Sequence, residues 1–365
     1  MPQTDSATDA EMMIRCCELA AKAAGHTAPN PLVGSVITQA DRVVGEGYHP
    51  KAGRPHAEIF ALRSAGAQAQ GATLYVNLEP CNHVGRTPPC SDALIQAGIR
   101  RVVIGMADPN PAASGGIEKL RAAGIEVNVG IEGNRCRQLN EAFIHRVRHH
   151  QPFGILKYAM TLDGKIATTT GHSAWVSGPE ARQQVHQLRS RCDAVIVGGN
   201  TVRQDNPHLT SHGQGDRNPL RIVMSRQLAL PAAAHLWDTQ VAQTLVMTQT
   251  GADSTVKKAL LRQGVEVVSF KRLTPTVVME TLHERGLLSV LWECGGTLAA
   301  EAIAAGSVQK VWAFIAPKLI GGVGAPSPIG NLNLQNMTDA RSLSRVTMMP
   351  VGEDFLVQGY LNPPK

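Results

Sequence analysis

The chain has 365 residues, of which 43% are hydrophobic and 18% are charged, and its formal net charge is +6. This length exceeds that of an ordinary single-core domain, so we expect two domains. Aromatic residues make up only 4%, which argues against a base-stacking surface for nucleic acid. The basic excess fits a phosphorylated small substrate and a phosphorylated cofactor equally well.

The first half of the chain alternates helical and strand patterns. Residues 12–24 predict an amphipathic helix, and residues 32–37 and 42–48 predict a hairpin. Further helices are expected at 57–65, 91–97 and 116–123, and further strands at 73–78, 101–106 and 125–131. Such alternation is typical of a layered α/β domain.

A domain boundary is expected near residue 150. A helix from about Arg135 ends in the basic run 145–150, which we interpret as a solvated linker face, and Pro152 stops it. The predicted domains are therefore 1–150 and 151–365. In the second half, strands are expected at 153–160, 193–198, 220–224 and 289–292, with a helix-capping pattern at 177–180.

The cysteines and the first residues bear on the cellular compartment. Seven cysteines without the spacing of a disulfide framework indicate a reducing cytoplasm. The first 25 residues contain no apolar run long enough for a signal peptide or a membrane span. We therefore expect a cytoplasmic protein.

One imidazole, two thiols and a carboxylate form the strongest chemical pattern: His56, Glu58, Cys81 and Cys90. Two cysteines and a histidine are an established ligand set for catalytic zinc, which keeps a fourth position open. Histidine, a glutamate two positions on, and a later Pro-Cys are typical of zinc deaminases, in which the glutamate is the acid/base. The cysteines here are nine positions apart, not three. Both are expected where turns enter helices.

A structural zinc site with His83 as fourth ligand is the alternative. Glu58 favours catalysis, because a structural site has no use for a carboxylate beside the metal. The expected reaction is attack of activated water on an amidine-like ring carbon that bears an exocyclic amine. Glu58 would carry the proton of the water to the ring nitrogen and then to the departing ammonia.

Glycine-rich turns in the second half suit a nicotinamide dinucleotide. A predicted strand runs into Gly295-Gly296-Thr297-Leu298 and then a helix, which offers backbone N–H groups to an anion. Gly198-Gly199 repeats this arrangement. Ser225 and Arg226 follow another strand, and a cation there favours NADP over NAD. For any single glycine pair, a simple tight turn is the alternative.

The segment from Pro80 to Cys90 resembles the signature of the bifunctional deaminase–reductases of riboflavin biosynthesis, as do segments 29–34, 45–49 and 108–111. This resemblance implies an N-terminal cytidine-deaminase-like three-layer αβα domain. It would act on a 2,5-diamino-6-(5-phosphoribosylamino)pyrimidinone. The implied substrate contacts are Asn30, His49, His83, Arg86, Asp108 and Asn110. Arg86 would pair with a phosphate or a ring oxygen.

Segments 157–167, 171–175 and 201–210 resemble the reductase half of the same family. The resemblance implies a C-terminal dihydrofolate-reductase-like α/β domain that uses NADPH to reduce the ribosyl to a ribityl side chain. The implied substrate contacts are Ser173, Arg189, Leu209 and Glu293, and the implied cofactor contacts are Ala159, Trp175, Thr201, Asp205 and the turn at 295–301. Lys157 and Asp205 are expected near the reacting imine.

One position departs from the pattern of the reductase half. Two residues after Thr210, where the resemblance leads us to expect a substrate-binding arginine, the chain has His212. Either His212 holds the substrate phosphate, less firmly at high pH, or Arg217 or Arg221 replaces the arginine.

Two other functions fit the sequence less well. A nucleic-acid deaminase with an RNA-binding extension conflicts with the cysteine spacing and the low aromatic content. A non-catalytic zinc-binding module leaves Glu58 and the second half unexplained. We expect a small-molecule substrate, no nucleic-acid or membrane partner, and a homo-oligomer (a dimer or tetramer).

Overall fold

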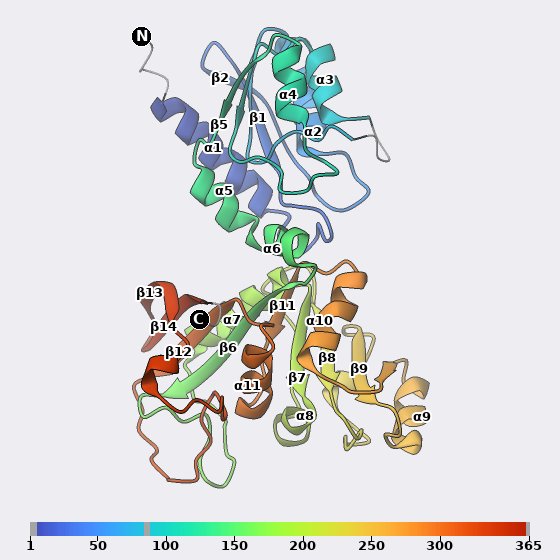
Figure 1. The fold of residues 1–365 in the computed structure, drawn as a ribbon, viewed down its shortest axis with the longest axis vertical. Helices are drawn as coiled ribbons and strands as arrows, with labels where there is room; N and C mark the ends of the chain where they lie inside the picture. The colour runs from blue at the N-terminus through green and yellow to red at the C-terminus, as the bar shows by residue number, and fades with distance from the viewer. Residues whose placement is uncertain (1–5, 84–87, 363–365) are drawn as a thin grey trace. The chain divides into compact units, whose positions relative to one another are not determined.

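The computed structural model describes residues 6–83 and 88–362 (Figure 1). The chain divides into two compact units, Met1–His150 and Gln151–Lys365. None of the described helices combines the length and apolar character that a membrane span requires.

The first unit is built on a five-stranded sheet with the order β2-β1-β3-β4-β5. Its strands are β1 (Gly34–Gln39), β2 (Arg42–Tyr48), β3 (Thr73–Val76), β4 (Arg101–Ile104) and β5 (Glu126–Val129). The β1–β2 and β1–β3 pairs are antiparallel, whereas β3–β4 and β4–β5 are parallel. The predicted hairpin turns at Ala40 and Asp41, both with positive φ, as a tight two-residue turn requires.

Helices cover both faces of this sheet (Figure 1). Along β3, Leu74 and Val76 enter one core cluster, with α2 (Ala57–Ala65), α3 (Cys90–Gln96) and α4 (Gly116–Ala122). Tyr75 points to the other face, where α1 (Ser6–Ala21) and α5 (Gly133–Leu139) pack, because successive strand side chains alternate between faces. The expected three-layer αβα arrangement is therefore confirmed.

Two glycines in β2 allow α2 to pack closely on the sheet. A Cβ on Gly45 would lie 2.4 Å from the carbonyl oxygen of Ala61, and one on Gly47 would lie 2.6 Å from that of Ala57. Any side chain at either position would push the helix outward. The Gly-x-Gly of segment 45–49 thus fixes the start of α2, where His56 and Glu58 lie.

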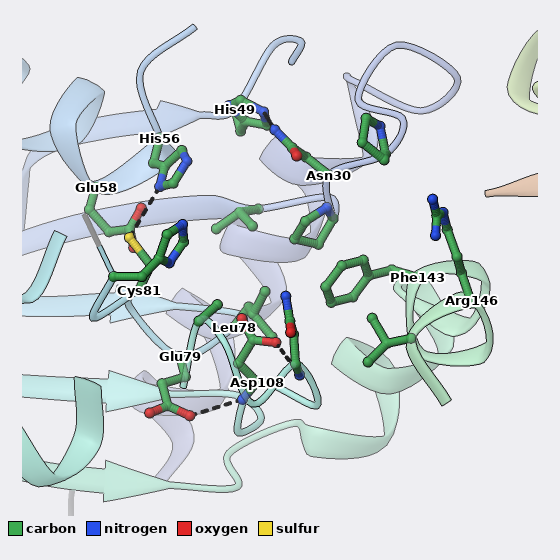
Figure 2. A pocket seen from close by; sticks show the side chains of 17 residues that line it. Asn30, His49, His56, Glu58, Leu78, Glu79, Cys81, Asp108, Phe143 and Arg146 are labelled. Carbon is green, nitrogen blue, oxygen red and sulfur yellow. Dashed lines mark hydrogen bonds between the residues drawn. The ribbon is translucent and has the colours of Figure 1, made fainter. Parts of the chain in front are cut away.

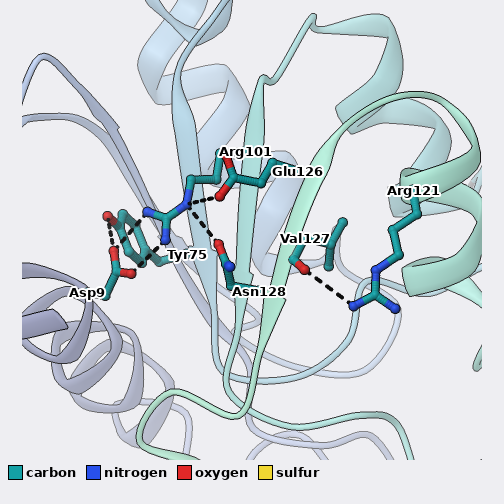
Figure 3. Close-up of polar contacts among 7 residues, drawn as sticks. All are labelled: Asp9, Tyr75, Arg101, Arg121, Glu126, Val127 and Asn128. Atoms are coloured by element: carbon teal, nitrogen blue, oxygen red, sulfur yellow. Dashed lines mark hydrogen bonds and ion pairs between the residues drawn. The ribbon is translucent and has the colours of Figure 1, made fainter. Parts of the chain in front are cut away.

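A largely buried ion pair ties α1 to the middle of the sheet (Figure 3). Arg101 in β4 donates to both carboxylate oxygens of Asp9, at 3.0 and 2.7 Å, and the Tyr75 hydroxyl donates to the same carboxylate at 2.9 Å. Arg101 also donates to Asn128 and Glu126 in β5. The side chains of Arg101 and Asp9 are only 14% and 7% exposed.

Replacing Arg101 with methionine should lower the free energy of unfolding of this unit by about 3 kcal/mol, because it leaves the Asp9 carboxylate buried without its cation. Hydrogen exchange of the β3 and β4 amides in the full-length protein measures this difference. Arg135→Met is the control. The Arg135–Glu132 pair is more exposed, so its loss should cost less than about 1 kcal/mol. Equal effects of the two substitutions would contradict the assignment.

The last helix of the first unit differs from the prediction. The single helix expected from about Arg135 is two helices, α5 and α6 (Glu141–His149), separated at Asn140. The buried Asn140 side chain accepts a hydrogen bond from the Leu32 N–H at 2.8 Å and donates to the Leu32 carbonyl at 2.9 Å. This long-range contact interrupts the helix at Asn140, so α6 begins as a separate helix at Glu141.

The second unit is built on a nine-stranded sheet with the order β10-β9-β8-β7-β11-β6-β12-β14-β13. Its strands are β6 (Phe153–Thr161), β7 (Ala194–Gly198), β8 (Leu220–Met224), β9 (Thr244–Gln249), β10 (Glu266–Phe270), β11 (Ser289–Trp292), β12 (Lys310–Ala316), β13 (Leu343–Val351) and β14 (Asp354–Leu361). The run from β10 to β12 is parallel, and β14 and β13 are antiparallel to their neighbours.

The helices of this unit also pack on both faces. Ala313 joins the core formed with α10 (Pro275–Glu284) and α11 (Gly296–Ala304), whereas Phe314 packs against α7 (Pro179–Arg191). The remaining helices are α8 (Gly199–Asp205) and α9 (Ser254–Arg262).

The capping box expected at 177–180 is wrong. The N-cap of α7 is Gly178, with no side-chain cap of its own, and Pro179 is the first helical residue. The Gly178 N–H donates to the Asp354 carboxylate at 2.7 Å, so the acceptor comes from β14.

Candidate active sites

His56, Cys81 and Cys90 converge in the first unit. His56 is the N-cap of α2, Cys90 is the first residue of α3, and Cys81 lies in the loop after β3. The Nδ1 atom of His56 is 3.5 Å from the Cys81 Sγ and 3.3 Å from the Cys90 Sγ. Among the described residues, these three side chains alone form a cluster whose ligand atoms all lie within 4.8 Å of one another.

This cluster fits a zinc ion with an open position. Two thiols and an imidazole are a zinc donor set, and His83 does not join them, so the expected structural alternative lacks its fourth ligand. The Cys90 thiol, and its backbone N–H at 3.4 Å, hydrogen-bond the Cys81 sulfur. These contacts hold the pKa of Cys81 well below its usual range. Cys90 begins a helix, as predicted. Cys81 does not begin a helix, but its sulfur accepts the backbone N–H of Cys90 at the N-terminus of α3.

Glu58 lies beside the cluster in the first turn of α2 (Figure 2). The side chain is almost fully buried, with 3% of the residue exposed. Burial raises the pKa of its carboxyl to about 7. Within the described part of the chain, its Oε2 atom has no hydrogen-bond partner. A buried carboxyl with a free oxygen can accept and release a proton near neutral pH.

A cavity of about 350 Å³ adjoins His56, Glu58 and Cys81 (Figure 2). Asn30 and His49 line it and are joined by a 3.0 Å hydrogen bond. The other ring nitrogen of His49, Nδ1, lies 3.0 Å from the Pro55 carbonyl, which can only accept. His49 therefore donates from Nδ1 and accepts the Asn30 amide at Nε2. Burial lowers the pKa of His49, which keeps this neutral form.

The loop after β4 forms another wall of the cavity and is held by Glu79. The buried Glu79 carboxylate accepts backbone hydrogen bonds from Asp108 and Gly115 at 2.9 Å and from Ile117 at 3.1 Å. Asp108 and Asn110 then face the cavity. Burial raises the pKa of Asp108 to about 6. The sequence prediction missed Glu79, although a carboxylate directly before Pro80-Cys81 was a visible signal.

The structure thus places five of the predicted substrate contacts on one cavity: Asn30, His49, His83, Asp108 and Asn110. Arg86 lies outside the described residues. Three lining residues, Phe143, Arg146 and Val147, come from α6 and were not predicted. The reading of the whole basic run as a solvated face is therefore wrong. Only its last three residues, 148–150, are exposed.

The second unit contains a buried charge cluster around Glu293. Arg189 donates to both carboxylate oxygens of Glu293, at 2.6 and 3.0 Å, and the Lys157 Nζ lies 3.8 Å from the same group. Burial alone would raise the pKa of Glu293, but Arg189 and Lys157 together lower it to about 2. Burial also lowers the pKa of Lys157, which Glu293 partly offsets.

A second cavity, of about 290 Å³, is lined by five of the predicted reductase residues: Lys157, Ala159, Ser173, Trp175 and Arg189. The Ser173 hydroxyl donates to Asp205 at 2.9 Å. The Arg182 guanidinium lies over the exposed Trp175 ring, with its Cζ atom 4.4 Å from the centroid of the ring. Leu209 is buried with a positive φ, and His212 stacks on His186, with ring centroids 4.2 Å apart. Neither residue is part of this cavity wall.

The two glycine turns and Ser225-Arg226 lie at the carboxyl ends of three adjacent parallel strands, β8, β7 and β11. These ends carry Ser225-Arg226, Gly198-Gly199 followed by Thr201, and Glu293 followed by Gly295 to Leu298. Ligands of open α/β sheets bind at such an edge. Arg226 is paired with Glu301 of α11 at 2.6 and 2.8 Å.

The two arginines proposed to replace an arginine at position 212 differ in their surroundings. Arg221 is fully buried and donates to the carbonyls of Leu236 and Asp238, at 3.1 and 2.7 Å. Arg217 donates to the Cys192 carbonyl at 3.2 Å and lies 3.9 Å from Asp193. These contacts brace the sheet, so the suggestion that Arg221 holds a substrate phosphate is wrong.

Two family models match the chain. Residues 6–106 match the cytidine and deoxycytidylate deaminase zinc-binding region. Residues 152–357 match the RibD C-terminal domain.

Similar proteins cover both units. The riboflavin biosynthesis protein RibD of Synechocystis sp. is 61% identical over 97% of this chain and 96% of its own length. RibD of Aquifex aeolicus is 41% identical over 96% of this chain and 97% of its own length. A crystal structure of a diaminohydroxyphosphoribosylaminopyrimidine deaminase/5-amino-6-(5-phosphoribosylamino)uracil reductase from Thermotoga maritima is also similar. It has a TM-score of 0.88 and 35% identity, and the match covers 98% of this chain and 99% of that one.

Proposed function

The chain belongs to the bifunctional deaminase–reductases of riboflavin biosynthesis, and we propose which of its residues perform the two reactions. The enzyme deaminates 2,5-diamino-6-(5-phosphoribosylamino)pyrimidin-4(3H)-one with zinc and then reduces the ribosyl to the ribityl side chain with NADPH. Residues 1–150 are proposed to carry the deaminase and residues 151–365 the reductase.

In the deaminase site, His56, Cys81 and Cys90 would hold the zinc. The bound metal supplies a Lewis acid that makes water a nucleophile at neutral pH. Glu58 takes one proton from the attacking water and delivers it to the ring nitrogen. It then transfers the proton of the newly added hydroxyl group to the exocyclic amine, which leaves as ammonia while the ring carbonyl forms. Asn30, oriented by His49, positions the pyrimidine, and Asp108 and Asn110 lie nearer the ribose.

The observation that carries this proposal is the buried Glu58 carboxyl with a free oxygen beside the Cys₂His cluster. A direct test incubates the purified protein with the phosphoribosylaminopyrimidine, with and without NADPH. Ammonia should be released in both cases, and NADPH should be consumed only after deamination. Consumption of NADPH without ammonia release would contradict the proposed order.

In the reductase site, Lys157 is proposed to donate a proton to the imine formed when the sugar ring opens. NADPH supplies the hydride when bound. Glu293 and Arg189 orient Lys157, and both are also proposed to contact the substrate, together with Ser173, Leu209 and His212. The proposed cofactor contacts are Ala159, Trp175, Thr201, Asp205, Ser225, Arg226 and the turn at 295–298. Such a site works mainly by orienting its two reactants.

Arg226→Ala should raise the KM for NADPH about tenfold or more and leave that for NADH unchanged, if Arg226 pairs with the 2′-phosphate. Because Glu301 holds the same guanidinium, the phosphate must compete with it. Glu301→Gln should therefore lower the KM for NADPH. Steady-state kinetics with both cofactors measures the two effects. An unchanged NADPH-to-NADH preference in Arg226→Ala would mean that another group binds the 2′-phosphate.

Two broader properties belong to the same proposal. We propose a homo-oligomer, because the edge strand β13 exposes Val346 and Met348 and its neighbour β14 exposes Phe355, and exposed apolar patches mark contact surfaces. We also propose a cytoplasmic enzyme, since none of the seven cysteines forms a disulfide.

A further inference from the structure

The deaminase cavity continues away from the metal cluster to helix α6. Figure 2 shows His56, Glu58 and Cys81 at one side of the cavity and Phe143 and Arg146 at the other, with Asn30 and Asp108 between them. Phe143, Arg146 and Val147 are spaced i, i+3 and i+4, so they share one face of α6. The next arginine, Arg148, is exposed and does not line the cavity.

Charge is distributed unevenly along this cavity. Glu58, Glu79 and Asp108 contribute carboxyl groups. Arg146 is the one arginine or lysine among the described residues that line it. The side chain of Arg146 is partly buried, and burial lowers its pKa, although an arginine stays charged. A guanidinium drawn partly out of water interacts more strongly with an anion than one at the open surface.

We propose that Arg146 binds the 5′-phosphate of the deaminase substrate and sets the preference of the enzyme for the phosphorylated compound. This inference rests on the proposed deaminase site. The substrate has a pyrimidine, a ribose and a phosphate in that order. The cavity has the metal cluster, then Asp108, then Arg146, so the order of recognition groups matches the order of the substrate. A guanidinium can bind a phosphate through two parallel hydrogen bonds, and Phe143 and Val147 shield that contact.

The test compares the 5′-phosphorylated substrate with its dephosphorylated riboside in wild type, Arg146→Ala and Arg148→Ala, all as full-length zinc-loaded protein. For Arg146→Ala, kcat/KM on the phosphorylated substrate should fall about 10- to 100-fold, with that on the riboside unchanged. Arg148→Ala, on the other face of the helix, should behave as wild type. Arg146→Gln, which keeps most of the packed side chain, carries the same expectation if the alanine variant does not fold.

Equal losses on both substrates would overturn the inference, since Arg146 would then only support the fold. An unchanged preference in both Arg146 variants would overturn it as well, because the phosphate would be bound elsewhere. Glu58→Gln distinguishes a failure of the proposed deaminase site from a failure of the role of Arg146. If that variant deaminates at the wild-type rate, the site assignment itself is wrong. If it is inactive while Arg146→Ala keeps the wild-type preference, only the role of Arg146 is wrong.

Discussion

Glu58→Gln should leave one zinc ion bound per chain and lower the deamination rate by about 10²- to 10⁴-fold, the contribution typical of a general acid–base group. Glutamine has nearly the same shape, so it fills the buried site in the first turn of α2, but it cannot accept the proton of water. Metal analysis of the purified variant and ammonia release without NADPH measure the two halves of this expectation.

Two further variants serve as controls for Glu58→Gln. Cys81→Ser should lose zinc, because it removes one of three ligand atoms. Glu118→Gln changes an exposed carboxylate on α4 and should retain full activity. If Glu58→Gln loses as much zinc as Cys81→Ser, Glu58 is a metal ligand and the assignment fails. Given already deaminated substrate, Glu58→Gln should oxidise NADPH at nearly the wild-type rate, since the proposed reductase residues all lie in 151–365.

The metal cluster could be predicted from sequence because its residue types occur in a pattern that is typical of zinc deaminases. His56 and Glu58 lie within one helical turn, and Cys90 begins the next helix, so the spacing of residue types carries most of the geometry. The alternation of helix and strand patterns predicted the α/β class, whereas the two specific folds were implied by the family resemblance alone.

The far end of the same cavity could not be predicted, because long-range contacts create it. Arg146 lines the cavity as part of α6, whose course depends on the break at Asn140 and its hydrogen bonds to Leu32, more than a hundred residues earlier. The basic run around Arg146 therefore looks like an ordinary solvated face in the sequence.

Arg221 illustrates the opposite error, because a residue that supports the fold was interpreted as a substrate-binding residue. The sequence suggests it only as a possible replacement for the arginine expected at position 212. In the folded chain it satisfies carbonyl groups of a later loop, including those of Leu236 and Asp238. Whether an arginine faces a ligand or buried carbonyls depends on how the loop folds back, which residue types do not encode.

Lys157→Met should lower the rate of the reductase step by about 10²- to 10⁴-fold and leave deamination unchanged, because it removes the proposed proton donor. The variant should fold, since Arg189 still pairs with both oxygens of Glu293 and methionine replaces the buried part of the lysine chain. NADPH oxidation on deaminated substrate measures the loss. Lys258→Met, at an exposed position on α9, is the matched control.

The pH profile distinguishes a proton donor from a residue that only positions the substrate. Burial lowers the pKa of Lys157, so its protonated form is present below that lowered value and is lost as the pH rises through it. The wild-type reductase rate should therefore decline at a lower pH than the ordinary lysine value of about 10.4. In Lys157→Met this decline should disappear from the residual rate. If the variant keeps it, another group supplies the proton and Lys157 acts only through its charge beside Glu293.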